Sequence, residues 1–308
     1  VGSSLICNGG DVGVTLTING GTFTQMNFLV VKNDALGTLN VTGGTFTSSH
    51  SAIQNWFKAN ITGGEINGQL WTDSWAVGES VGETTIGGNA KVKGEIVMDI
   101  TGSIKPTLEI SGGNFDVTWR ITNAAANAGA KPAVSGGTFS SAVAPEYCAE
   151  GFEPIANGDG TFGVKEISAA KIGNVEYETL AAAFAAAKDG ETIVLLKNSS
   201  GNGIQVNTEK FVNQGLTVDF NGHTYTVGGV LVGSTGTGTN AFQLLAGGKV
   251  TFMNGSIVGV AEGTKPAEDT PNWHGAPAMM IQNYCDLTLQ SMTISGGDET
   301  VYTCLLYT

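Results

Sequence analysis

The sequence predicts an all-β protein folded as a parallel β-helix, a solenoid in which each coil of the chain stacks on the previous one. The first observation is a recurring phrase: an apolar residue, a small polar residue, Gly-Gly, one residue, then an aromatic residue or Ile. It occupies residues 18–23, 41–46, 61–66, 110–115 and 134–139, with a degenerate copy at 85–90 that lacks one residue. The first glycines, at 20, 43, 63, 87, 112 and 136, are separated by 23, 20, 24, 25 and 24 residues. This period indicates one coil per repeat.

The second observation is the composition of each repeat. Glycine recurs in every unit, and it disfavours helix interiors by about 1 kcal/mol relative to Ala. The flanking Thr, Val, Ile and Phe residues favour strands, and Leu16-Thr17-Ile18-Asn19 alternates with period 2. The Gly-Gly pair permits a sharp turn.

Equivalent residues of stacked coils should lie about 4.8 Å apart. We therefore expect an inward aliphatic column of Ile18, Val41, Ile61, Ile110 and Val134. A second column should contain Phe23, Phe46, Ile66, Phe115 and Phe139. The polar residues before Gly-Gly could form a hydrogen-bonded ladder of Asn19, Thr42, Thr62, Ser111 and Ser135.

The period divides the chain into three parts. Residues 1–140 form the first β-helical module, and residues 141–166 form a terminating coil and a hairpin with its turn at Asp159-Gly160. Residues 167–308 form a second module, which begins with a short capping α-helix near 178–188. Alanines favour this helix, Thr179 can cap it, and Asp189-Gly190 ends it.

The second module has its own phrase, with Asn-Gly pairs at 221 and 254. Their separation of 33 residues exceeds one bare coil. We therefore expect protruding loops at 234–239 and 262–269.

The Gly-Gly coils resemble the right-handed parallel β-helix superfamily typified by pectate lyases. More narrowly, the SGGTFS coil, followed by Gly151-Phe152-Glu153-Pro154 and by Asn157-Gly158-Asp159-Gly160-Thr161-Phe162, resembles glycine-rich surface proteins of gut Firmicutes. Residues 170–196 are similar to the N-terminal cap of β-helical modules in such proteins. The resemblance covers nearly the whole chain and implies right-handed coils, but its motifs do not specify an activity.

Composition narrows the partners. The net charge is −13 and Arg120 is the only arginine, which argues against nucleic acid, anionic lipid and polyanionic glycans. No run approaches the roughly 18 apolar residues of a membrane span, and no signal peptide is present. The charge pattern favours an extracellular, secreted or cell-surface location. Strand-like residues at both ends suggest an excised piece, or end-to-end stacking with neighbouring β-helical modules or chains.

The four cysteines are Cys7, Cys148, Cys285 and Cys304. None forms a CxxC pair, so a zinc ribbon or redox motif is not predicted. Buried thiols and disulfides both remain open. If any pair is bridged, it is Cys285 with Cys304, which are 19 residues apart.

Catalytic motifs are largely missing. There is no adjacent Asp-Asp pair, and the surroundings of His223 and His274 match polygalacturonase-like motifs only in part. Stacked coils could still pair Asp73 with Asp99 or Asp116, as a glycosidase would require. We expect no cofactor and no metal, and we leave enzymatic activity undecided while favouring its absence.

Aromatic residues mark a candidate carbohydrate-binding surface. If they point outward, they form a ridge for sugar rings, with polar groups beside them for hydroxyl contacts; if inward, they are core. The candidate residues are Trp56, Trp71, Asp73, Trp75, Trp119 and Arg120.

The leading hypothesis is a non-catalytic β-solenoid, an adhesin-like, stalk or carbohydrate-contact segment of a larger bacterial surface protein. Its partner would be a glycan or a host surface ligand. The alternatives are a polysaccharide lyase or glycoside hydrolase on a β-helix, and a phage tail-fibre module.

Overall fold

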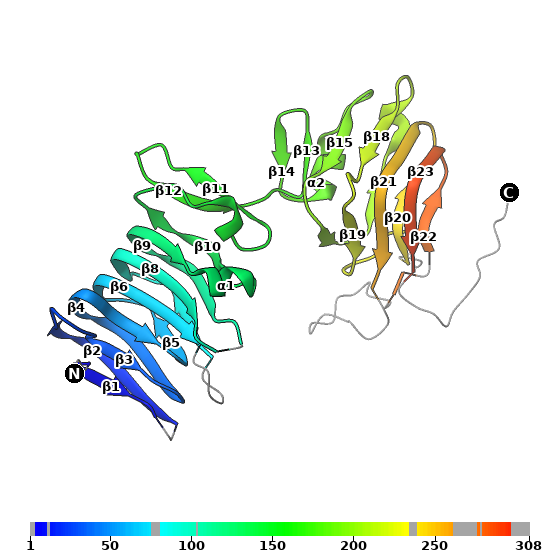
Figure 1. Ribbon diagram of the computed structural model, residues 1–308. Coiled ribbons are helices and arrows are strands. Elements are labelled where there is room, and N and C mark those ends of the chain that lie inside the picture. The colour runs from blue at the N-terminus through cyan, green and yellow to red at the C-terminus, as the bar shows by residue number, and fades with distance from the viewer. Residues whose placement is uncertain are drawn as a thin grey trace. The chain divides into compact units, whose positions relative to one another are not determined.

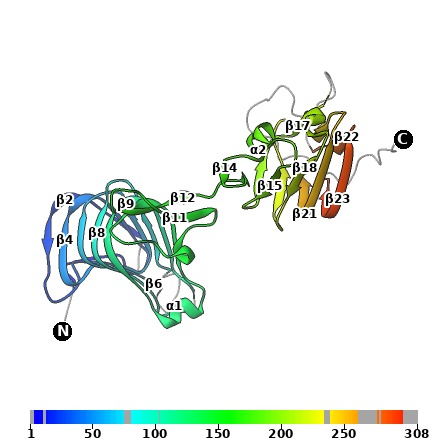
Figure 2. The ribbon, with the colours of Figure 1, turned by 90° about the horizontal axis from the view of Figure 1, so that it is seen from above.

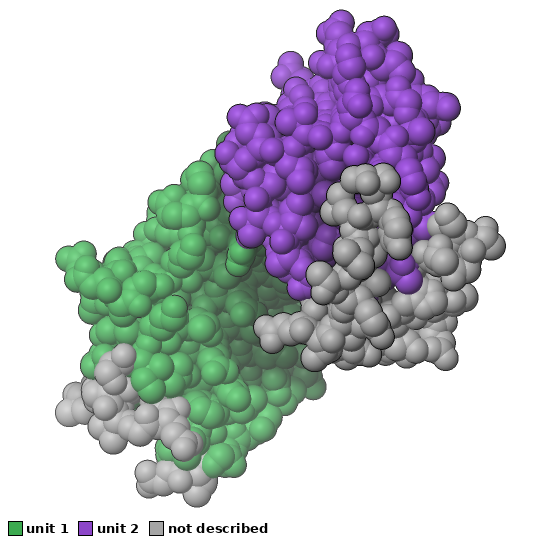
Figure 3. Space-filling model, turned by 90° about the vertical axis from the view of Figure 1, so that its right-hand side faces the viewer, with its two compact units in different colours: residues 1–166 green, residues 167–308 purple. Residues whose placement is uncertain are grey.

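The computed structural model describes residues 4–10, 13–74, 81–102, 104–233, 239–260, 276–277 and 279–296. The chain is mostly β and divides into two compact units, Val1–Glu166 and Ile167–Thr308 (Figures 1 and 3). Each unit contains stacked parallel strands, and each is described separately.

The first unit is built from strands that pair in parallel across successive repeats. One series is β2 (Val14–Thr24), β4 (Gly37–Asn55), β6 (Glu65–Ser74), β8 (Lys91–Ile100), β9 (Thr107–Ile121) and β10 (Pro132–Phe139). A second series joins β1 (Ile6–Asn8) and β3 (Val31–Asn33) to β4. A third links β4 and β9 through β5 (Lys58–Ile61) and β7 (Glu83–Ile86). Figure 2 shows the long strands lying one behind another.

The end of the unit is irregular. It contains the helix α1 (Asn123–Asn127), the 3-10 turn η1 (Pro145–Tyr147) and the antiparallel hairpin of β11 (Phe152–Ala156) and β12 (Phe162–Glu166). The hairpin joins the same sheet, because Phe162 pairs with Phe139 of β10.

The Gly-Gly phrase is explained by two separate constraints. The second glycine has a positive φ in all six copies, between 57° and 111°, which favours glycine. The first glycine lies against the preceding coil: a Cβ added at Gly63 would be 2.2 Å from the Thr42 carbonyl oxygen. Both glycines are therefore structural.

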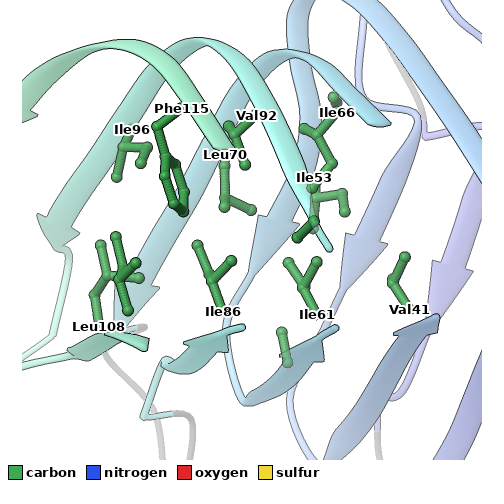
Figure 4. Close-up of a cluster of buried hydrophobic side chains, with 14 of the residues drawn as sticks. Val41, Ile53, Ile61, Ile66, Leu70, Ile86, Val92, Ile96, Leu108 and Phe115 are labelled. Carbon is green, nitrogen blue, oxygen red and sulfur yellow. The ribbon is translucent and has the colours of Figure 1, made fainter. Parts of the chain in front are cut away.

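The predicted core columns are confirmed. Register connects the aliphatic column Ile18, Val41, Ile61, Ile86, Ile110 and Val134. Figure 4 shows Val41, Ile61 and Ile86 in line, facing side chains from the opposite strands. In the second column, Phe23 stacks on Phe46 at 5.2 Å and Phe115 on Phe139 at 4.7 Å.

The degenerate repeat keeps its place in the second column. Val92 pairs with both Ile66 and Phe115, so it stands where other coils have Phe or Ile. The phrase lacks a residue before Gly87-Gly88, but extra residues after it compensate. Reading Ala90 as the last residue of this copy was therefore wrong.

The polar ladder differs from the prediction. At the expected position, Thr42 donates to Asn19 (2.7 Å), but Ser111 and Ser135 donate to backbone carbonyls of the preceding coil. The continuous ladder is buried at another corner. There Asn8 donates to Asn33 (2.7 Å) and Asn33 to Asn55 (2.8 Å). These amides satisfy the corner within the core.

The second unit repeats parallel stacking with shorter strands. One series is β15 (Thr192–Leu195), β18 (Leu216–Asp219), β21 (Lys249–Gly259) and β23 (Asp286–Ser295). A second is β16 (Ser199–Gly201) and β19 (Thr224–Val227), which joins β21. A third is β17 (Ile204–Val206), β20 (Asn240–Leu244) and β22 (Met279–Asn283).

The predicted helix is present but shorter than expected. Helix α2 spans Leu180–Ala186, and Thr179 caps it by accepting a bond from Ala182 N (3.1 Å). Phe184 lies 6.2 Å from Phe242 and 6.3 Å from Phe252, between ring centroids. Together with the antiparallel strands β13 (Ala170–Ile172) and β14 (Val175–Tyr177), α2 packs at the first strands of the stack.

The Asn-Gly corners also have a conformational cause. Asn221, Asn254 and Ser291 have φ of 50°, 59° and 52°, a region that Asn tolerates better than most residues. The 3-10 turn η2 (Thr208–Phe211) packs against β21. Of the two predicted loops, residues 234–238 and 262–269 lie outside the described residues.

Candidate functional site

The candidate site lies on an outward-facing row of the first unit. Parallel register aligns one residue from each of β1, β3, β4, β6, β8 and β9. The row is Cys7, Lys32, Gln54, Trp71, Val97 and Arg120. Because side chains alternate along a strand, the preceding residues Ile6, Val31, Ile53, Leu70, Ile96 and Trp119 face the core.

A groove of about 450 Å³ opens over the first part of this row. Its lining consists of Ser4, Cys7, Phe28, Leu29, Lys32, His50, Gln54, Trp56 and Trp71. Its volume falls within the range of small-molecule sites, which combine aromatic walls with a few polar groups. Phe28 is 44% exposed, so it presents an apolar surface to a ligand.

Lys32 occupies the ring face of Trp56. Its Nζ lies 4.2 Å from the ring centroid of Trp56 and 2.7 Å from Asp34 Oδ2. The ammonium group is thus held by a cation–π contact and an ion pair. Trp56 therefore positions a cation in the groove.

Trp71 is the other indole of the groove. It is half-buried on β6, between Gln54 and Val97 in the row. Its Nε1 is buried without a hydrogen-bond partner. Packing rather than hydrogen bonding therefore fixes the ring, a rigid arrangement suited to stacking against a sugar.

Asp73 lies on the same strand but not in the groove lining. It is 2% exposed and accepts hydrogen bonds from the Thr101 backbone N (3.1 Å) and Oγ1 (2.9 Å). Burial raises the pKa of Asp73, and the charge of Asp99, its neighbour in register, adds to this rise. Asp99 in turn accepts a 2.6 Å bond from Thr122 Oγ1.

The predicted pairing of Asp73 with Asp99 is thus confirmed as a neighbour relation between strands. The alternative partner, Asp116, instead pairs with Lys93. The Asp73–Asp99 pair is tied to threonines and is absent from the groove lining.

Trp119 and Arg120 do not join the groove. Trp119 packs in the interior, with ring centroids 6.3 Å from Phe139 and 5.3 Å from Tyr147. Arg120 shares the outward row but its Nε lies 3.1 Å from Glu95 Oε2, which also accepts from Gln69. A continuous ridge including Trp119 is therefore not formed, because that position faces inward.

Two of the remaining predicted residues cannot be placed. Trp75 and Cys304 lie outside the described residues, so the predicted Cys285–Cys304 pairing does too. Cys285 is a half-buried free thiol in the described part of the chain.

Sequence reasoning missed Lys32, His50 and Gln54 as lining residues. Counting from the second glycine of each phrase gave no signal for them. Lys32, Gln54 and Trp71 stand 11, 10 and 7 residues after Gly21, Gly44 and Gly64. The unequal lengths reflect register shifts near Ser51.

The lining can bind and orient a ligand, but it offers no acid pair for hydrolysis. None of the described residues around the groove carries a carboxylate, whereas most glycosidases need two. Within the described ranges, no group of three or more His, Cys, Asp or Glu could hold a metal ion. In the same ranges, no helix has the length and apolar character needed to cross a membrane.

Comparisons with protein-family models, curated proteins and solved structures gave no match.

Proposed function

We propose that the chain is a right-handed parallel β-helix of two tandem modules, serving as a non-catalytic segment of a secreted or cell-surface bacterial protein. In this proposal the first module contacts carbohydrate through the groove. Parallel pairing at the repeat interval supports the coil architecture. The acidic, arginine-poor composition and the resemblance of the Gly-Gly coils to surface proteins support the location.

The observation that carries the binding proposal is the groove lined by Phe28, Trp56 and Trp71. Aromatic faces beside Gln54 and Lys32 match the needs of a sugar, which has apolar C–H faces and polar edges. A binding role without chemistry agrees with a lining that has no carboxylate.

A glycan array and a reducing-sugar release assay on the full chain test this function. We expect binding of a defined set of glycans, its loss in Trp71→Leu, and no release of reducing ends. Trp119→Phe is a matched control, because it changes an indole in the core and leaves the groove unchanged. Absence of binding to any glycan would overturn the carbohydrate contact.

The second candidate function is glycoside hydrolysis, favoured by the adjacent carboxyls of Asp73 and Asp99. Release of reducing ends that disappears in Asp73→Asn and Asp99→Asn would establish hydrolysis and overturn the non-catalytic proposal. Retention of binding in both variants, without release, would support the groove alone.

A further inference from the structure

The groove has a charge opposite to that of the chain. The sequence carries a net charge of −13, yet the lining contains Lys32 and His50 and no acidic residue. Charge complementarity at a site selects its partner more than it sets the affinity. The lining therefore selects for an anionic group on the ligand.

Lys32 is placed to receive that group. Its side chain is 25% exposed, and its ammonium has three N–H donors, of which Asp34 accepts one. The Trp56 ring holds the ammonium at 4.2 Å and limits its rotation. The remaining donors are available to a carboxylate that enters the groove.

The row also limits the number of charges. On either side of Lys32 it continues with Cys7 and Gln54, which are uncharged. A ligand with a charge on every sugar would need a series of cations, whereas one carboxylate needs one. Trp71 lies two strands from Lys32, about 10 Å at the usual strand spacing.

We infer that the groove binds one terminal sugar residue carrying a single carboxylate, with its apolar face toward Trp71 and its carboxylate toward Lys32. This inference rests on the proposed carbohydrate contact and specifies its ligand. Two sources share the chemistry, a sialic-acid type sugar and a terminal uronic acid.

Calorimetric titration of the full chain with three methyl glycosides tests the inference. The probes are methyl α-N-acetylneuraminide, methyl β-glucuronide and, as the neutral match, methyl β-galactoside. We expect at least one acidic probe to bind about tenfold more tightly than the neutral one, the effect of one charge-assisted hydrogen bond. The acidic probe that binds more tightly identifies the source.

Three variants separate charge recognition from folding. Lys32→Gln should abolish the preference for the acidic probe, and Lys93→Gln should leave it intact, because Lys93 pairs with Glu65 outside the groove (3.3 Å). Asp34→Asn should strengthen acidic binding, because it removes the competing acceptor. Asn can retain the Oδ1 contact to the Ala35 backbone N (2.8 Å).

Each outcome is decisive. Equal binding of acidic and neutral probes would overturn the acidic ligand and leave the proposed carbohydrate contact standing. No binding of any probe, together with a blank glycan array, would overturn both. A polyuronate that binds more tightly per residue than the single sugars would overturn the limit of one charge.

Discussion

Replacing the first glycine of one phrase by alanine measures how closely the coils approach. A Cβ at Gly63 would lie 2.2 Å from Thr42 O and 2.9 Å from Thr42 C. Carbon–oxygen contacts are normally about 3.3–3.6 Å, so the coils would have to separate by roughly 1 Å. Gly20, in the same position of the first phrase, has nothing within 4 Å of an added Cβ.

The cost follows from what resists this separation. Thr62 N and Gly63 N donate to Val41 O at 2.8 and 3.3 Å, so the shift strains these bonds. Overpacking costs about 1–3 kcal/mol, and a weakened hydrogen bond adds about 1 kcal/mol. We expect Gly63→Ala to lower the free energy of unfolding of the first unit by about 2–4 kcal/mol.

Gly20→Ala should instead be neutral or stabilising by up to about 1 kcal/mol, because alanine restricts the unfolded chain. Urea unfolding followed by tryptophan fluorescence is suitable, since four of the five tryptophans lie in residues 1–166. Equal effects of the two substitutions would refute the role of coil contact at this glycine.

Three further predictions concern buried polar groups. Asn33→Ala leaves two buried carbonyls without their side-chain donor, so urea unfolding should show a loss of about 2–4 kcal/mol; Asn19→Ala, at an exposed ladder, should cost about 0.5 kcal/mol. Burial raises the pKa of Tyr225 from 10.0 to about 12. The unfolded chain therefore loses this proton first, and the stability of the second unit should fall as pH rises from 10.0 to about 12; a Tyr225→Phe variant with the same slope would contradict this. The raised pKa of Asp73 means that the folded chain holds this proton above pH 3.8, so first-unit stability should fall as pH rises through the folded pKa, and Asp73→Asn should flatten that slope in a series of urea titrations.

Much of the fold could be predicted because the phrase is a local signal with a physical cause. Positive φ at the second glycine and coil contact at the first recur in each coil, so both are visible as sequence. The columns through Ile18 and Phe23 follow directly from the same register. Helix α2 was equally accessible, because Thr179 and the alanines that follow are local signals.

The polar corner could not be located in the same way. Asn8, Asn33 and Asn55 align only after register shifts that the phrase does not encode. The same shifts place Trp119 inward, although it stands 6 residues after Gly113 and Trp71 stands 7 after Gly64. One residue reverses the face of a strand, so counting could not decide between core and surface.

Differences among the coils themselves indicate where the fold leaves the sequence free. The aliphatic column through Val41 contains only Ile and Val in six coils, because packing admits little else there. The outward row has six different residue types in six strands, so coil stacking does not determine their identity. A lysine held on an indole, beside an exposed second aromatic and a half-buried Trp71, is costly to arrange at positions that folding does not require. The physical basis for assigning function to this row is therefore that its residues satisfy no demand of the repeat, whereas every residue of the Gly-Gly phrase does.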